Sequence, residues 1–219
     1  MNKKYKQPWP TKAAMAQVYD KNLWGKGEDL FYSGEGSHLK YIVKPYVDNV
    51  RFFLKSFKLP VSVCDLGCGD FNIGKHLVDF TSEYIAVDIV DNLINYNKEK
   101  FKFKNLSFLS LDIAKDDLPK ADCVFIRQVL QHLSNKEVAA VVKKLYRYKY
   151  IILTEHLPVE DFEPNIDIIS GQGIRLKKKS GINLLAPPFN LEVKSEKQLV
   201  SVNLNDNKGV LVTTLYQLF

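Results

Sequence analysis

The stretch Val61–Gly69, V-S-V-C-D-L-G-C-G, indicates the fold of this chain more clearly than any other. An apolar, β-branched run ends in Asp65 and is followed by two glycines with G-x-G spacing. A second apolar run, Tyr84–Asp88, also ends in an acid, nineteen residues after the second glycine. Strand, glycine turn, helix, strand and acid follow one another in a nucleotide-binding βαβ unit. The stretch therefore predicts a Rossmann-like α/β fold with a nucleotide at the glycine turn.

The residues around the two glycines argue against a dinucleotide. The fingerprint G-x-G-x-x-G needs a third glycine for close helix–strand packing, and Asn72 stands at that position. Asp65 would place an anion beside a pyrophosphate, whereas it suits a ligand that carries an ammonium group. Asp88 is placed to accept hydrogen bonds from ribose hydroxyls. The alternative is an unrelated α/β protein in which the glycine turn and the two acids coincide by chance.

Length and composition indicate one globular domain over residues 1–219. Apolar residues make up 46% of the chain, which is enough for a substantial core at this length. The net charge is +6, from 31 basic and 25 acidic side chains. A positive charge can favour nucleic acid or phosphorylated partners, but the lysines are scattered apart from Lys177–Lys179. A general lysine bias is the simpler interpretation, and we expect a small-molecule partner and no nucleic acid.

The cysteines and the N-terminus bear on the compartment. Cys64, Cys68 and Cys123 are an odd number and have neither a disulfide framework nor zinc spacing, so we expect a reduced cytoplasmic environment and no metal. The first ten residues are basic, but no apolar segment of a signal peptide follows them. No run of eighteen apolar residues is present, so we expect no membrane span.

Residues 1–36 combine Trp9 and Trp24 with a piece rich in glycine and serine. We expect an ordered loop that acts as a lid and excludes water from the reacting centre. An N-terminal arm that packs its aromatic rings on the domain is the alternative. Ser37 should then cap a helix whose apolar residues recur at helical spacing, and Pro45 should bend or split that helix.

The middle of the chain alternates strand-like and helix-like segments. Strands are expected at about 61–66, 84–89, 106–111, 121–125 and 150–154, and helices at about 73–80, 92–99 and 135–148. Asp91 should cap the second helix, and Ser134 with Glu137 forms an S-x-x-E capping box before the third. This alternation predicts a doubly wound, mostly parallel sheet.

The last third of the chain is rich in proline and glycine, and residues 155–189 are too many to serve only as a connector. We expect this segment to recognise the substrate, because long ordered loops on a rigid scaffold usually carry recognition. Arg175 could clamp a phosphate or carboxylate at two points. The neighbouring Lys177–Lys179 either add positive charge or simply face solvent. Further candidate substrate ligands in the segment are Asn165, Asp167 and Asn183.

An acid–x–Gly–x–Gly turn followed by an acid at the end of the second strand resembles motifs I and II of class I S-adenosylmethionine-dependent methyltransferases, over roughly residues 60–157. The resemblance implies a seven-stranded, mostly parallel sheet completed by an antiparallel C-terminal hairpin, here about 190–202 and 210–218. It implies S-adenosyl-L-methionine as the cofactor. Asp112 is expected near the adenine amino group, unless it only caps the turn that follows. The cofactor site implied comprises Trp24, Ser37, Asp65, Gly67, Gly69, Asp70, Asp88, Ile89, Leu93, Asp112, Ile113, Arg127 and Gln128.

His132 and Arg127, just after the fourth strand, are the candidate catalytic residues. His132 is a candidate general base, because the pKa of histidine lies near the operating pH. It could instead donate a hydrogen bond to the substrate or have a structural role. Arg127 and Gln128 could hold the methionine carboxylate or the substrate, and Arg127 could equally form an ion pair at the surface.

A narrower resemblance spans most of the chain. The segments W-G at 24, S-G-x-G-S at 33–37, D-L-x-C-G-D-F-N at 65–72, D-I-V at 88–90, R-Q-x-L-Q-H-L-S at 127–134 and N-x-D-I…G…R…N-L…P-F at 165–189 are similar to one group of bacterial methyltransferases. Members often occur among genes for capsule or surface-glycan synthesis. The resemblance implies an active site lined by Trp24, Ser37, Arg127, His132 and Arg175. Gln172–Ile174 departs from it, because an aromatic residue is expected near the arginine.

The resulting hypothesis is an O-methyltransferase that acts on a small sugar or anionic precursor of a bacterial capsule or surface glycan. The acceptor would be a sugar hydroxyl or a phosphate or phosphoramidate group of a phosphorylated or nucleotide-linked precursor. The alternatives are an RNA or protein methyltransferase, a catalytically silent cofactor-binding protein, and an NAD-linked oxidoreductase. The last is disfavoured by Asn72 and by the lack of a second domain.

Overall fold

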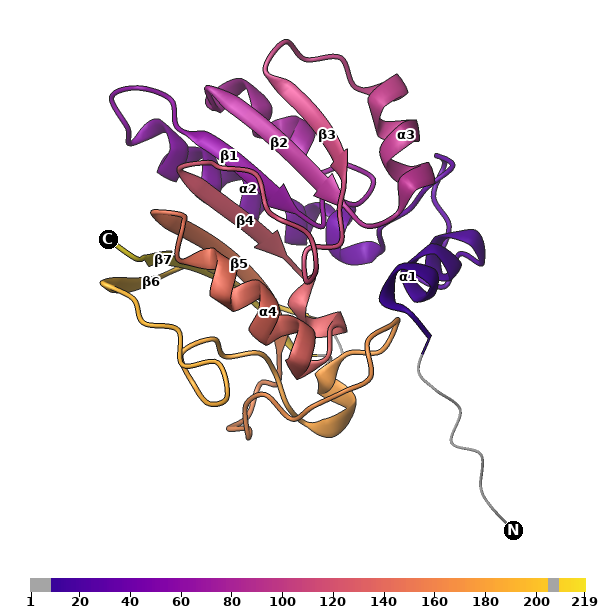
Figure 1. Cartoon of the computed structure of the whole chain (residues 1–219), viewed down its shortest axis with the longest axis vertical. Coiled ribbons are helices and arrows are strands. Elements are labelled where there is room, and N and C mark those ends of the chain that lie inside the picture. Colours follow the sequence, from indigo (N-terminus) through magenta and orange to yellow (C-terminus); the bar gives the residue numbers. More distant parts are fainter. Residues whose placement is uncertain (1–8, 205–208) are drawn as a thin grey trace.

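A seven-stranded sheet forms the centre of the protein, which we describe from a computed structural model over residues 9–204 and 209–219 (Figure 1). The strand order is β3-β2-β1-β4-β5-β7-β6. The first five strands pair in parallel, whereas β7 is antiparallel to both β5 and β6. The predicted doubly wound sheet with an antiparallel C-terminal hairpin is therefore confirmed. The strands are β1 (Ser62–Leu66), β2 (Glu83–Asp88), β3 (Leu106–Ser110), β4 (Cys123–Arg127), β5 (Tyr150–Leu157), β6 (Ser195–Asn203) and β7 (Val210–Gln217).

Both faces of the sheet are covered, which explains why the central strands read as continuous apolar runs. On one face, helix α2 (Lys40–Lys55) and helix α3 (Asp91–Lys100) pack on a cluster that contains Tyr84 and Phe125. On the other face, helix α4 (Asn135–Leu145) packs on a cluster that contains Leu66 and Ile126. Successive side chains of β1 and β4 thus supply the two cores alternately.

The helix α1 (Thr11–Asp20) was not anticipated within the predicted lid. Its buried side chains include Met15, Val18 and Tyr19, at helical spacing. Figure 1 shows α1 across the end of the sheet toward which β1, β2 and β4 point. The first eight residues of the predicted arm lie outside the described residues.

Several local predictions were wrong. Ser37 does not cap α2; it ends a 3₁₀ turn, Glu35–Ser37, and Leu39 stands at the cap position. Pro45 lies within α2 and does not split it, because the helix continues to Lys55; a bend at Pro45 stays a prediction. The stretch after the glycine turn forms two 3₁₀ turns, Gly74–His76 and Val78–Phe80, in place of one helix.

Of the two capping predictions for the other helices, one is wrong and one is confirmed. Asp91 is the first residue of α3 and makes no cap hydrogen bond, because Val90 occupies the cap position. The capping box of Ser134 and Glu137 before α4 is confirmed, with both of its hydrogen bonds present. Within the described part of the chain, no helix is both long and apolar enough to cross a bilayer.

Candidate functional site

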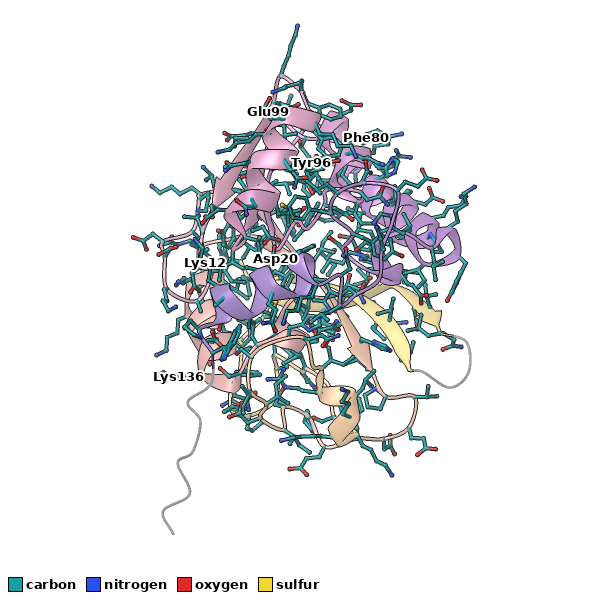
Figure 2. All side chains as sticks on the ribbon, turned by 90° about the vertical axis from the view of Figure 1, so that its right-hand side faces the viewer. Lys12, Asp20, Phe80, Tyr96, Glu99 and Lys136 are labelled. Atoms are coloured by element: carbon teal, nitrogen blue, oxygen red, sulfur yellow. The ribbon has the colours of Figure 1, made fainter. Side chains whose placement is uncertain are left out.

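A cavity of about 540 Å³ opens at the carboxyl ends of β1 to β4, where the strand order reverses between β1 and β4. This is the edge at which open α/β sheets bind ligands. Figure 2 shows α1, between Lys12 and Asp20, crossing the side of the molecule above this edge. The cavity lining contains eleven of the predicted site residues, namely Trp24, Ser37, Gly67, Gly69, Asp88, Ile89, Asp112, Ile113, Arg127, Gln128 and His132.

The glycine turn after β1 needs its glycines for conformation and for space. Gly67 and Gly69 have φ angles of +78° and +55°, in the left-handed region that favours glycine. A Cβ on Gly67 would collide with the side chain of Val129. The amides of Gly67 and Cys68 both donate to the Val87 carbonyl oxygen, at 2.8 and 2.9 Å, so the turn is fixed to the end of β2.

Asp88 lies at the end of β2 with its carboxylate in the cavity. One carboxylate oxygen accepts from the Gly69 amide and the other from the Val90 amide, both at 3.1 Å. Burial raises the pKa of Asp88 to about 6 against the lowering effect of these amides. The carboxylate thus joins the two strand ends and keeps acceptor capacity for ligand hydroxyls.

Asp65 is buried in β1 and is not among the residues that line the cavity. The Tyr84 hydroxyl donates to it at 2.9 Å. Burial raises the pKa of Asp65 to about 7, although the Tyr84 hydrogen bond and the Arg127 charge oppose the shift. Its charge can therefore act on a ligand only from behind the glycine turn.

Asp112 and Ile113 follow β3 and reach the cavity. The Asp112 carboxylate accepts from the Ala114 amide at 3.1 Å and pairs with Lys115 at 2.7 Å. It therefore fixes the turn and lines the cavity, so both interpretations of Asp112 stay open.

Arg127 is held in place by its surroundings at the end of β4. Its guanidinium donates to the Gly36 carbonyl oxygen at 2.6 Å and to the Ser37 hydroxyl at 3.4 Å. It also lies over the Tyr46 ring, 4.9 Å from the centroid. Burial of the guanidinium lowers the pKa of Arg127. Arg127 is thus a half-buried cation at the cavity that carries no ion pair to a described carboxylate within 4.0 Å.

His132 is neutral and oriented by two hydrogen bonds. Its Nδ1 lies 3.2 Å from the Gly171 carbonyl oxygen and must donate to it, which leaves Nε2 as the acceptor. The side-chain amide of Gln131 lies 3.3 Å from Nε2, and its oxygen accepts from the His156 amide at 3.1 Å. Burial lowers the pKa of His132 to about 4. The Trp24 ring packs on the imidazole at 5.1 Å between centroids.

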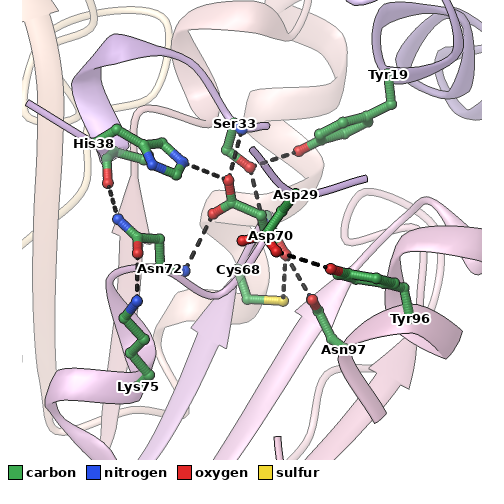
Figure 3. Close-up of polar contacts among 12 residues, drawn as sticks. Tyr19, Asp29, Ser33, His38, Cys68, Asp70, Asn72, Lys75, Tyr96 and Asn97 are labelled. Carbon is green, nitrogen blue, oxygen red and sulfur yellow. Dashed lines mark hydrogen bonds and ion pairs between the residues drawn. The ribbon is translucent and has the colours of Figure 1, made fainter. Parts of the chain in front are cut away.

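The N-terminal arm is fastened to the glycine turn by Asp70, which does not line the cavity (Figure 3). One oxygen of its carboxylate accepts from the Ser33 amide at 2.8 Å and lies 2.6 Å from His38 Nε2. The Asp70 amide donates to the Ser33 hydroxyl at 2.8 Å, and the Tyr19 hydroxyl lies 3.0 Å from the same oxygen. In this structure Asp70 holds the arm, and its role in cofactor binding stays a prediction.

Five other predicted residues also lie outside the cavity lining. Leu93 packs in a small core beneath α1. Asn165 donates to the carbonyl oxygens of Asn183 and Pro187, and Asp167 accepts from the Asn135 amide. Arg175 is buried and donates to carbonyl oxygens of the turn after β4. The residues with which segment 155–189 lines the cavity are Gln172, Gly173, Ile174 and Lys177.

The sequence patterns did not predict the lining residues of α1 and the arm. They are Thr11, Met15, Tyr19, Ser33, Gly34, Glu35 and Gly36. The helical spacing of Met15, Val18 and Tyr19 was a usable signal. Glu137 was recognised only as part of a capping box, yet it also lines the cavity and accepts a hydrogen bond from Thr11.

The central part of the chain is similar to a known protein family. Residues 63–149 match a family model described as a methyltransferase domain. Over 89 residues the chain is 32% identical to phosphoethanolamine N-methyltransferase 1 of Arabidopsis thaliana, a match that covers 38% of this chain and 18% of that protein. The chain thus spans about a fifth of the length of this relative.

Two solved structures extend the likeness to the whole fold. The N-methyltransferase NodS from Bradyrhizobium japonicum WM9, in complex with S-adenosyl-L-homocysteine, superposes with a TM-score of 0.67 at 11% identity, over 93% of this chain and 98% of that one. Magnesium protoporphyrin IX methyltransferase from Synechocystis PCC 6803, with bound S-adenosylmethionine, gives 0.60 at 16% identity, over 97% and 100%. Residues 63–149 therefore resemble a methyltransferase domain, and the chain as a whole has the fold of these two methyltransferases.

Proposed function

We propose that the protein transfers the methyl group of S-adenosyl-L-methionine to an oxygen of a small sugar or anionic precursor of a bacterial capsule or surface glycan, in the cytoplasm. The observation that carries the proposal is the convergence of the glycine turn, Asp88, Arg127 and His132 on one cavity at the switch point of the sheet. The cavity volume is within the range typical of small-ligand sites.

The cavity residues fit the cofactor group by group. Asp88 would accept hydrogen bonds from the ribose hydroxyls, and Gly67 lines the cavity without a side chain. Arg127 and Gln128 would hold the methionine carboxylate, with Asp65 favouring the ammonium group from behind the turn. Asp112 and Ile113 would lie against the adenine, and Trp24 and Ser37 would close the site. The bound sulfonium supplies an activated methyl group, and the chain supplies orientation and a dry site.

The protonation state of His132 favours one kind of acceptor group over another. An efficient general base has a pKa near the operating pH, whereas burial lowers the pKa of His132 to about 4 and Gln131 already faces its Nε2. His132 is therefore better suited to orient the acceptor than to remove its proton. This supports an acceptor oxygen that is already anionic at neutral pH, such as that of a phosphate or phosphoramidate group.

Arg127 and Lys177 add positive charge at the cavity, which favours an anionic acceptor. The proposed partner is accordingly a phosphorylated or nucleotide-linked glycan precursor. Segment 155–189 would contribute to its recognition through Gln172–Ile174 and Lys177, because these residues line the cavity and Asn165, Asp167, Arg175 and Asn183 do not.

A second candidate is methylation of an amine. It is favoured by the relatives, since the Arabidopsis protein and NodS are both described as N-methyltransferases. A neutral amine also needs no base with a pKa near 7. RNA or protein as the acceptor, and a catalytically silent cofactor-binding protein, remain lesser alternatives.

The proposal is tested in two steps. Isothermal titration should show that S-adenosylhomocysteine binds and NAD does not; the reverse result eliminates the proposal. Isotope-labelled S-adenosylmethionine is then offered with a panel of phosphorylated sugars, nucleotide-linked sugars and small amines, and the products are analysed by mass spectrometry. Label on a phosphate-type oxygen supports the first candidate, and label on nitrogen supports the second. Binding without transfer to any member would favour the silent alternative.

A further inference from the structure

The turn that carries Gln131 and His132 is held by a segment far away in sequence. Residues 130–133 follow β4, and the backbone carbonyl oxygens of all four accept from segment 171–175. Arg175 donates to Leu130 at 3.1 Å, to Gln131 at 3.4 Å and to Leu133 at 2.8 Å. The Gly171 amide donates to the His132 carbonyl oxygen at 3.0 Å. Every carbonyl of the turn is thus satisfied by one docked loop.

The Arg175 guanidinium is unusually constrained for an arginine on a long loop. The side chain is 1% exposed, and it also donates to Asn135 Oδ1, at the start of α4, at 2.6 Å. Such a fork of donors fixes several acceptors at once, which a lysine ammonium cannot do with the same geometry. Arg175 therefore joins the 130–133 turn to the first turn of α4.

A buried carboxylate lies beside the same turn. Glu155, near the end of β5, is 3% exposed, and neither of its oxygens has a hydrogen-bond partner in the described part of the chain. Arg175 Nε is a second buried atom without a partner there. Burial raises the pKa of Glu155 to about 8, while the Arg175 charge and the Gln131 and Leu130 backbone oppose the shift. An isolated buried carboxylate is costly unless a nearby cation or donor compensates it.

We propose that Arg175 and Glu155 are positioning residues for His132, and that Arg175 is no substrate clamp. Arg175 donates hydrogen bonds to carbonyl oxygens of the 130–133 turn. Glu155 lies beside the backbone of Leu130 and Gln131, at the start of this turn. The next residue on β5, His156, donates its amide to Gln131 Oε1 and so orients the amide that faces His132 Nε2. The imidazole thereby keeps one tautomer and one direction toward the cavity. This inference rests on the proposed function only in the statement that the oriented imidazole serves methyl transfer.

The test measures the tautomer of the His132 ring directly. Nitrogen NMR spectra of histidine-labelled protein, with the His132 signal assigned from H132Q, distinguish the two neutral tautomers. Spectra are compared for the wild type, R175K, E155L and the matched control K178M, with and without saturating S-adenosylhomocysteine. Lys178 lies in the same 3₁₀ turn as Arg175, but it is exposed and donates only to the Asp167 carbonyl oxygen among the described contacts.

The wild type and K178M should show His132 as a single tautomer protonated at Nδ1. In R175K and E155L the two nitrogen signals should move toward each other as the second tautomer becomes populated, with the dissociation constant of S-adenosylhomocysteine within about threefold of the wild type. Unchanged His132 spectra in folded R175K and E155L overturn the inference, and if R175K does not fold, E155L decides alone. If the wild type fails to bind S-adenosylhomocysteine, the proposed function fails instead, and the spectra without ligand still decide the role of Arg175.

Discussion

At the scale of single residues, the site places ionisable groups where burial works against their charge. Asp65 is the sharpest case, since burial raises its pKa to about 7. The unfolded chain ionises this carboxyl near its ordinary pKa, so the folded state binds the extra proton between about pH 4 and 7. The contribution of Asp65 to stability is therefore largest in acid and declines as the pH rises through this window.

The substitution Asp65→Asn should raise stability and lower cofactor affinity. At roughly 1.4 kcal/mol per pKa unit, the gain in unfolding free energy at pH 8 is on the order of 4 kcal/mol, and it should nearly vanish at pH 4. The ammonium group of S-adenosylhomocysteine would lose a nearby anion, so its dissociation constant should rise about tenfold or more. Urea unfolding at both pH values and isothermal titration check the two signs. A less stable variant at pH 8, with unchanged affinity, would contradict this account.

His132 gives a second prediction about single residues. Its pKa is about 4, so the imidazole is neutral throughout the range from pH 5 to 8. For a phosphate-type acceptor we expect a rate that does not vary with His132 ionisation in this range. His132→Gln should reduce the rate by about tenfold or less, because removing a true general base costs about 10²-fold to 10⁴-fold. A larger loss, or a rate that rises through pH 6 in the wild type only, would instead identify His132 as the base.

At the scale of elements, the N-terminal arm depends on one carboxylate. Asp70 accepts from the Ser33 amide and contacts His38, and these bonds hold residues 33–38 over the cavity. Charge-assisted hydrogen bonds of this kind contribute about 1.5–3 kcal/mol each. Asp70→Ala should therefore make S-adenosylhomocysteine dissociate about ten times faster, as measured by stopped-flow fluorescence of Trp24.

A matched control for the arm is Asp20→Asn, which removes an exposed carboxylate from the end of α1. It should leave the dissociation rate unchanged. Equal rates in the wild type, Asp70→Ala and Asp20→Asn would show that the contacts of Asp70 do not restrain the arm.

The elements also show what local patterns can predict. The five parallel strands and the capping box of Ser134 and Glu137 follow from apolar runs and a short polar signature, both of which are local. The two 3₁₀ turns after the glycine turn were mistaken for a helix, because Ile73, Leu77 and Phe80 have helical spacing and pack on the core of the sheet. The α1 helix was not predicted, because the tryptophans and glycines around it indicated an ordered loop.

At the scale of the whole molecule, the site brings together the arm, four strand ends and the loop after β5. Residues attached directly to strand ends, such as Asp88 and Arg127, were predictable because parallel strands deliver them to one edge. The position of Arg175 was not predictable. The direction of its side chain depends on how a loop without regular strands or long helices docks on the 130–133 turn. Sequence spacing carries no information about such docking.

The prediction of one domain over residues 1–219 can be tested because Trp9 and Trp24, the only tryptophans, both lie in the arm. Met15 and Tyr19 pack with Val90 and Leu93, so the arm shares a core with α3 and should unfold together with the sheet. Unfolding curves from tryptophan fluorescence, which reports the arm, and from far-ultraviolet circular dichroism, which reports the sheet, should therefore coincide. Saturation with S-adenosylhomocysteine at a hundred times its dissociation constant should stabilise both by about 2.7 kcal/mol. A fluorescence transition at lower urea that merges with the other only when ligand is present would show that the arm is a separate lid, folded onto the domain by the cofactor.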